Sequence, residues 1–488
     1  MTSTRVIHAG GERRHARIHL VVLIVATLIV FAAHFRPWEV AYLEEWPLAS
    51  DWNSNDGWAF APNYFEWTLS RPLHLLPSLL GLAITGGAPG GIFLILGLVA
   101  AAQLPVVVWA LRPISKSFWV SASVGMFLAL HPLWPGGFLQ RFLPAQTAAL
   151  ALAIALGLLI RWLRTGQVRW IVWACVTLLV GFAVYPGPAV VAPLMALAIA
   201  LVVQASWKRR IVSVAAVTAT SAFMTLYSLV ITRLISPSGT SYELGNIAQA
   251  GVTDVRALVS YVQSTLFARG ELLLLAILAI AILGAVLALS GAIPHPAGWL
   301  ISGVALASPV TTIVYFGHAG WLSDIDRLGY VIALALFVAL SVWASSTRGI
   351  RVRLESAIAA LLVAASLFGA VRGIQQWQPD IALQHRLLNA LGPAVAEAEG
   401  DEVVFVVDRS GTFGYNGTFP LQYLGAASRV WNDDDTEVML CFEEPATLPS
   451  GATYCDPSAT GNGARLVETL TMDTGTVDIF IGRKDSND

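Results

Sequence analysis

The chain has 488 residues, of which 56% are hydrophobic and 12% are charged, and its formal net charge is −2. Soluble domains carry about 25% charged residues. This composition, together with a mean hydropathy of +0.67, therefore excludes an ordinary soluble protein.

Long apolar runs predict a polytopic α-helical membrane protein with about eleven transmembrane helices within residues 1–371. Short loops on one side hold fifteen Lys and Arg, whereas the opposite loops hold seven. The positive-inside rule therefore predicts a multi-pass protein of the plasma membrane with its N-terminus in the cytoplasm and its C-terminus outside. The predicted spans are 18–35, 90–111, 117–132, 142–160, 168–185, 188–206, 211–234, 271–290, 297–317, 328–345 and 354–371.

The first predicted external loop, 38–89, is acidic and ends in an interfacial helix. The part from Trp38 to Arg71 holds six acidic residues, whereas all of 1–371 holds thirteen. A carboxylate held close to a hydroxyl can remove its proton, so the loop is a candidate for general-base chemistry. A solvated polar loop is the alternative. The six acidic residues are Glu39, Glu44, Glu45, Asp51, Asp56 and Glu66.

Five tryptophans interrupt the same loop. They fit the aromatic belt of a membrane interface, and they would also suit a surface that binds sugars. The residues alone do not separate these two interpretations. The five are Trp38, Trp46, Trp52, Trp58 and Trp67.

Three arginines, Arg71, Arg141 and Arg327, are expected at the external edges of helices. The planar guanidinium donates hydrogen bonds in pairs and suits phosphate. Snorkelling towards lipid headgroups is the alternative. Asp326 beside Arg327 is either an ion-pair partner or a second acidic corner of a site. His131, before a proline, is more typical of a helix end than of a catalyst.

Residues 380–488 predict a small extracytoplasmic α/β domain, with a helix over 380–399 and strands over 402–407 and 476–481. Residues 372–488 hold eighteen acids against seven bases, which argues against binding of nucleic acid or an anionic lipid surface. Cys441 and Cys455 either pair or stay reduced. No cysteine or histidine spacing indicates a zinc site.

Four short motifs occur in an order that resembles one known superfamily. They are Glu44-Glu45 after the first span, Ser70-Arg71-Pro72-Leu73 before the interfacial helix 74–84, His131-Pro132 with Arg141 at the third loop, and Asp326-Arg327-Leu328-Gly329-Tyr330 at a late span. In this order, through about residue 345, the chain resembles integral-membrane glycosyltransferases of the GT-C type, the superfamily of the protein O-mannosyltransferases.

The resemblance implies an inverting transfer of a sugar from a polyprenyl-phosphate donor to a hydroxyl on a cell-envelope glycan, lipid or protein, at the outer face of the membrane. Glu45 is then the first candidate for the base, followed by Glu44, Asp51 and Asp56. The family pattern has Asp more often at this point. Some relatives use a divalent cation, and no ligand set for one is evident here. The implied substrate-binding residues are Arg71, His131, Arg141, Asp326, Arg327 and Tyr330.

Two other classes of function compete with a transferase. A flippase or exporter of lipid-linked sugars would tend to show inverted repeats and charges near the membrane midplane. An envelope scaffold would act through residues 380–488. The charges instead gather at one predicted face, which favours chemistry there. The sugar, the acceptor, the lipid length and the oligomeric state are left open.

Overall fold

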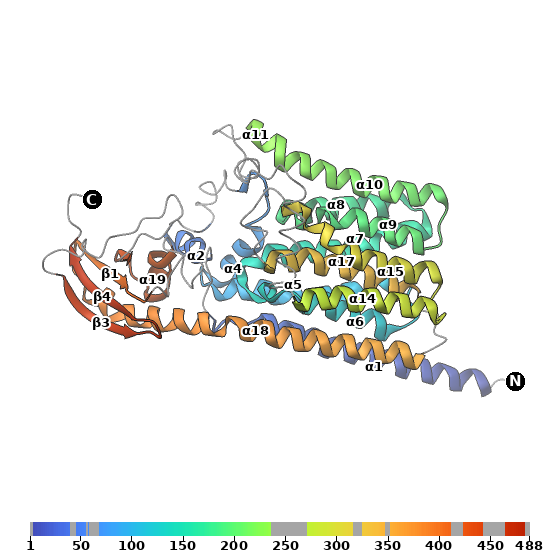
Figure 1. The fold of residues 1–488 in the computed structure, drawn as a ribbon, viewed down its shortest axis with the longest axis horizontal. Helices are drawn as coiled ribbons and strands as arrows, with labels where there is room; N and C mark the ends of the chain where they lie inside the picture. Colours follow the sequence, from blue (N-terminus) through green and yellow to red (C-terminus); the bar gives the residue numbers. More distant parts are fainter. Residues whose placement is uncertain are drawn as a thin grey trace.

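The computed structural model describes residues 3–39, 45–54, 57, 68–235, 271–315, 325–346, 352–410, 423–442 and 464–483. It has two parts, a helical bundle and a small sheet domain, at opposite ends of an elongated molecule (Figure 1). Helix α18 (Val352–Glu397) belongs to both, because it begins beside the bundle and ends against the sheet. We call the end of the bundle that faces the sheet the domain-side end.

The helices of the bundle follow the apolar runs of the sequence. The long ones are α1 (Ser3–His34), α5 (Gly90–Leu111), α6 (Phe118–Leu130), α7 (Leu143–Thr165), α8 (Val168–Val184), α9 (Val191–Val202), α10 (Trp207–Leu226), α14 (Glu271–Leu289), α15 (His295–Ala307) and α17 (Ile325–Ser346). The short ones are α2 (Glu45–Ser54), α4 (Leu76–Thr85), α11 (Thr232–Ile235), the 3-10 turns η2 (Pro135–Phe138), η3 (Gln140–Phe142), η4 (Gly187–Ala189) and η6 (Ser308–Tyr315), and the π-helix η5 (Tyr227–Ile231).

A helix occurs at each of the eleven predicted spans. Within the described residues, six helices are long and apolar enough to cross a membrane. The predicted helical class is therefore confirmed and is compatible with a membrane protein, while the number eleven stays a prediction. The six are Ala16–His34, Gly90–Leu111, Gln140–Thr165, Glu271–Leu289, Arg327–Ser346 and Arg353–Glu397.

The bundle is built around α17 and α7. Helix α17 is buried along almost its whole length, and its Phe337 and Trp343 are among the largest fully buried side chains. Helix α1 lies at the edge of the bundle and exposes apolar residues such as Leu20 and Leu28. An outer surface of this kind is expected where the surrounding solvent is lipid.

The sheet domain contains four strands in the order β2-β1-β4-β3. Strand β1 pairs in parallel with β2 and antiparallel with β4, which also pairs antiparallel with β3. The two predicted strands and the predicted helix are confirmed. The helix, however, is the end of α18, so the boundary predicted between bundle and domain falls inside one continuous helix. The strands are β1 (Glu402–Asp408), β2 (Val438–Phe442), β3 (Arg465–Thr471) and β4 (Thr476–Arg483).

Strand β1 is buried on both of its faces, as its apolar composition requires. Val404 and Val406 point to the face that packs against α18 and α19 (Leu424–Asn432). Phe405 points to the opposite face, in a second apolar cluster with Cys441. Cys441 is disulfide-bonded, whereas Cys455, its expected partner, lies outside the described residues.

Helix α2 connects the two parts of the molecule (Figure 1). Its Trp46 is 1% exposed and lies in the core of the sheet domain, where its indole N–H donates to Gln384 at 3.4 Å. Leu48 and Ala49, two and three residues later, pack against α4 and α5 in the bundle. The expectation that Trp46 faces a membrane interface or a sugar is therefore wrong, since its indole is buried in the apolar core of the sheet domain.

Some glycines lie where two segments of the bundle approach each other most closely. Substitution of such a glycine tests this close packing. A Cβ at Gly369 of α18 would lie 2.5 Å from the Pro132 ring, whereas one at Gly303 of α15 would meet nothing within 4 Å. We expect Gly369→Ala to destabilise the protein by about 1–3 kcal/mol, because backbone and ring must move apart. Gly303→Ala is the matched control and should be neutral or slightly stabilising. Thermal unfolding in detergent measures both, and equal midpoints would contradict this packing.

Candidate functional site

Arg71, the first of the three arginines predicted to meet a phosphate, lies at the domain-side end of the bundle. Its guanidinium carbon is 5.9 Å from the centre of the Tyr185 ring. The backbone fixes the segment there, since the Leu73 amide donates to the Ala183 carbonyl at 3.1 Å. The end of α8 therefore positions Arg71 beside Tyr185.

A row of aromatic rings leads from Tyr185 into the bundle. Tyr185 packs edge-on against Tyr330 with 5.5 Å between ring centres, and Tyr330 lies 4.7 Å from Trp134. A Cβ at Gly187 would lie within 3.0 Å of both tyrosine rings, so glycine allows this close packing. The buried Tyr330 hydroxyl donates to the Ala145 carbonyl at 2.9 Å. Tyr330 is thus a buried residue that packs between Tyr185 and Trp134. Its predicted contact with substrate stays a prediction.

Arg141 stands at the other end of this row. The ring centres of Trp134 and Phe142 are 5.1 Å apart, and the Arg141 guanidinium lies 5.4 Å from the Phe142 ring. Arg327, the third arginine, is half-buried in the first turn of α17. The three arginines therefore lie at one end of the bundle, and aromatic rings link Arg71 to Arg141.

His131 is enclosed in the protein, where it ends α6. Its φ of 43° is the left-handed conformation that caps a helix. Its Nε2 lies 2.5 Å from Gln146 Oε1, which also accepts a hydrogen bond from Gln103 at 2.7 Å. The amide of Gln146 donates to the Gly137 carbonyl at 2.9 Å. These bonds give His131 a structural role here, and its predicted contact with substrate stays untested.

The segment 131–142 is irregular, yet most of it is buried in the bundle. Buried backbone carbonyls need hydrogen-bond partners, because irregular backbone at membrane depth is tolerated only inside protein or a cavity. Arg36 donates to the Phe138 carbonyl at 2.6 Å, and the Trp377 indole donates to the Pro135 carbonyl at 3.3 Å. The end of α1 and the middle of α18 therefore hold this segment in place.

Arg36 and Glu39 form a buried ion pair next to this segment. Arg36 Nη1 lies 2.7 Å from Glu39 Oε1, and each side chain is 4% exposed. Gln378 of α18 donates to the same oxygen at 2.7 Å. Burial raises the pKa of the Glu39 carboxyl, while its neighbours Arg36 and Gln378 act in the opposite direction. The pair was not predicted, because both residues follow a predicted membrane span in the sequence and were interpreted as charged residues of a loop.

Helix α2 carries two of the four acids proposed as the base. Glu45 is 5% exposed in the first turn, where the helix dipole favours a carboxylate. Asp51, almost two turns later, is half-buried. Ser50 between them accepts a hydrogen bond of 3.0 Å from Arg429 of α19, so the sheet domain fixes the helix. Glu44 and Asp56 lie outside the described residues, as does the side chain of Asp326.

The π-helical turn η5 is a further feature that the sequence did not reveal. It places Ser228 so that its hydroxyl donates to the Ser70 carbonyl at 3.1 Å. Turns of this type occur frequently at functional sites. Here the turn supports the chain next to Arg71 from the side of α10.

The ion pair at Arg36 and Glu39 yields a test of stability. Glu39→Gln keeps the shape and leaves the buried guanidinium without its counter-charge, so we expect a loss of about 3–5 kcal/mol in the free energy of unfolding. The matched control is Asp401→Asn, because Asp401 and Arg483 are about three-quarters exposed in their 3.4 Å ion pair. This change should cost less than about 1 kcal/mol. Equilibrium unfolding in mixed micelles compares them, and similar losses would contradict the structural role of the buried pair.

Within the described residues, no group of three or more His, Cys, Asp or Glu side chains is arranged to hold a metal ion. No protein-family model matches the chain, and no characterised protein matches it in sequence. Residue geometry at the domain-side end of the bundle is therefore the basis for a functional proposal.

Proposed function

We propose that the chain is a membrane glycosyltransferase of the GT-C type, which moves a sugar from a polyprenyl-phosphate donor to a hydroxyl on a cell-envelope glycan, lipid or protein. One observation supports this most. Arg71 and Arg141 lie at the same end of the bundle as α2, which carries Glu45 and Asp51. Guanidinium groups suit the phosphate of the donor, and carboxylates suit deprotonation of the acceptor.

The transfer is a single displacement in this proposal. A carboxylate of the first loop takes the proton of the acceptor hydroxyl as its oxygen attacks the anomeric carbon. The bond from that carbon to the phosphate oxygen breaks, and polyprenyl phosphate leaves. Arg71, Arg141 or Arg327 stabilises the negative charge that develops on the leaving group. The step needs no redox partner.

Asp51 is the base that we favour among the two described acids. It is half-buried on α2 and so is more accessible to an acceptor hydroxyl than Glu45, which is 5% exposed beside the buried Trp46. A base must come within hydrogen-bond distance of the proton that it removes. Glu45 was the first candidate from the sequence. Because Glu45 is the more deeply buried of the two, we now place Asp51 before it. Glu44 and Asp56 stay candidates from the sequence alone.

The proposed site lies on the outer side of the plasma membrane. The excess of Lys and Arg in the short loops at the other end of the bundle supports a cytoplasmic N-terminus. With about eleven spans, the domain-side end and the sheet domain then lie outside. Donor and acceptor of envelope glycans would meet there.

Substitution of Asp51 tests the proposed base. Asp51→Asn keeps the size of the side chain and removes its basicity, so we expect sugar transfer to fall by about 10²–10⁴-fold. Glu45→Gln should reduce transfer less, and Asp401→Asn on the sheet domain is the control without effect. Release of polyprenyl phosphate by the purified protein, with labelled lipid-linked sugars as donors, measures the rate. Full activity of both Asp51→Asn and Glu45→Gln would rule out these two residues as the base.

Substitution of Arg71 tests the proposed phosphate contact. Arg71→Ala should lower kcat by about 10²–10³-fold, and Arg71→Lys should restore part of it, because lysine keeps the charge but not the paired donors. The control is Arg169→Ala, which removes an exposed arginine at the start of α8, at the opposite end of the bundle. A protein that moves lipid-linked sugar across vesicles but releases no polyprenyl phosphate would be a transporter, contrary to this proposal.

A further inference from the structure

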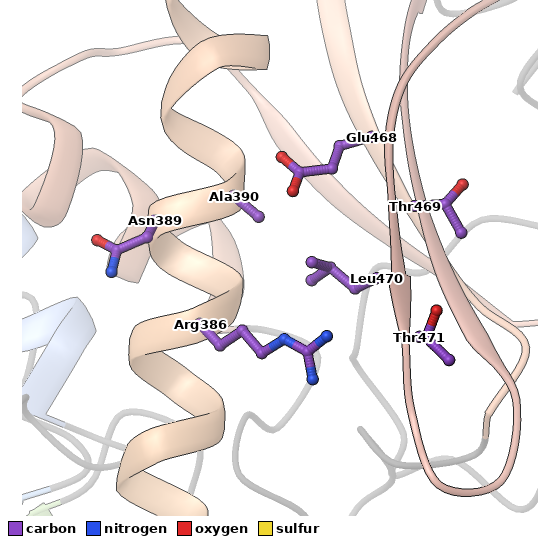
Figure 2. A pocket seen from close by; sticks show the side chains of 7 residues that line it. All are labelled: Arg386, Asn389, Ala390, Glu468, Thr469, Leu470 and Thr471. Carbon is purple, nitrogen blue, oxygen red and sulfur yellow. The ribbon is translucent and has the colours of Figure 1, made fainter.

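The sheet domain has a hollow of about 470 Å³ between α18 and the edge strand β3. Figure 2 shows Arg386 entering it from the helix and Glu468 and Leu470 entering it from the strand. Within the described part of the chain, the side chains of Arg386 and Glu468 form no ion pair or hydrogen bond. The hollow is open to solvent and offers a donor and an acceptor on opposite walls.

An oriented tryptophan lies across α18 from this hollow. Asn389 borders the hollow but turns its side chain away from it (Figure 2), and its amide oxygen accepts a hydrogen bond of 3.2 Å from the Trp431 indole. His385 packs edge-on against the same indole with 5.2 Å between ring centres. Trp431 nevertheless remains 38% exposed. Its two contacts fix the ring in advance, so a ligand that stacks on it loses little additional conformational freedom.

The chemistry of this surface matches a carbohydrate. Each sugar hydroxyl both donates and accepts, so it can bond to an arginine that only donates and to a carboxylate that only accepts. The apolar C–H faces of a sugar ring suit the exposed indole. The charges of Arg386 and Glu468 cancel, and residues 372–488 carry eighteen acids against seven bases. An uncharged sugar is therefore favoured over an anionic one.

We infer that the sheet domain binds an uncharged oligosaccharide that crosses the exposed face of α18, with one part in the hollow between Arg386 and Glu468 and another stacked on Trp431 on the other side of the helix. The inference rests on the proposed function, because it identifies the acceptor as a neutral glycan that the domain holds close to α2. Helix α19, which carries Trp431, also contacts α2 through Arg429 and Ser50. Bound glycan would thus contact the helix that packs against α2, which carries Asp51.

Binding of neutral tetrasaccharides tests this site. Maltotetraose, mannotetraose and cellotetraose are titrated into the full-length protein in lipid nanodiscs, with tetragalacturonate as the anionic comparison. Ligand-observed NMR and calorimetry report the affinity. We expect at least one neutral tetrasaccharide to bind and tetragalacturonate not to bind. Failure of all three neutral probes, or tighter binding of the anionic one, overturns the inference.

Variants localise the binding. Trp431→Ala and Glu468→Gln should each weaken it by about ten-fold, and Trp431→Phe should weaken it less because an aromatic ring remains. Trp207→Ala is the matched control, because Trp207 is 70% exposed at the start of α10 in the bundle. Unfolding midpoints confirm that each variant is folded. Unchanged affinity in both Trp431→Phe and Glu468→Gln, with both folded, places the sugar elsewhere and overturns the inference.

The variant Asp51→Asn separates this inference from the proposed function. It should bind the tetrasaccharide with unchanged affinity while it loses transfer. Saccharide binding at Trp431 without release of polyprenyl phosphate by the unsubstituted protein would contradict the transferase and support the glycan site. If the protein binds none of the probes and its transfer is unaffected by Trp431→Ala and Glu468→Gln, the transferase is supported and the glycan site is contradicted.

Discussion

The buried ion pair of Arg36 and Glu39 is the interaction on which the domain-side end of the bundle depends. It connects three elements that are far apart in the sequence: the end of α1, the irregular segment 131–142 through Phe138, and α18 through Gln378. Removing two charges from water is expensive. Part of this cost is offset because Arg36 also donates to a backbone carbonyl and Glu39 also accepts from an amide, while Arg36 Nε and Glu39 Oε2 have no partner among the described residues. A rigid end to the bundle follows, and both arginines of the aromatic row are attached to it.

The sheet domain is an integral part of this arrangement. Its core contains Trp46 from the first loop, and its helix α19 bonds to Ser50 of α2. The helix with the candidate acids therefore has apolar neighbours on two sides, one set from the bundle and one from the sheet domain. A short helix of this composition would be marginal by itself in water. Tertiary contacts fix where Glu45 and Asp51 lie, which is the requirement for positioned acid–base chemistry.

Local patterns in the sequence were enough to predict the helices and two of the strands. Apolar runs mark the long helices, and the run from Glu402 to Val407 marks a strand buried on both faces. Long-range contacts were not predictable in this way. Trp46 bonds to a residue 338 positions later, and the partners of the segment 131–142 come from α1 and α18. A single sequence carries no signal for such pairs, so the buried ion pair, the aromatic row and the role of Trp46 appeared only in three dimensions.

The position of Trp46 also has a consequence for biosynthesis. A ribosome makes α2 early, whereas the last strand that completes the core around this indole ends at Arg483. For most of translation the first loop must therefore wait without its final neighbours, its large apolar side chain exposed to water, lipid or a chaperone. Chains truncated before β4 would leave that loop without its apolar neighbours. Loss of the C-terminal strand would therefore expose an apolar side chain near the N-terminus, where quality-control factors can recognise it.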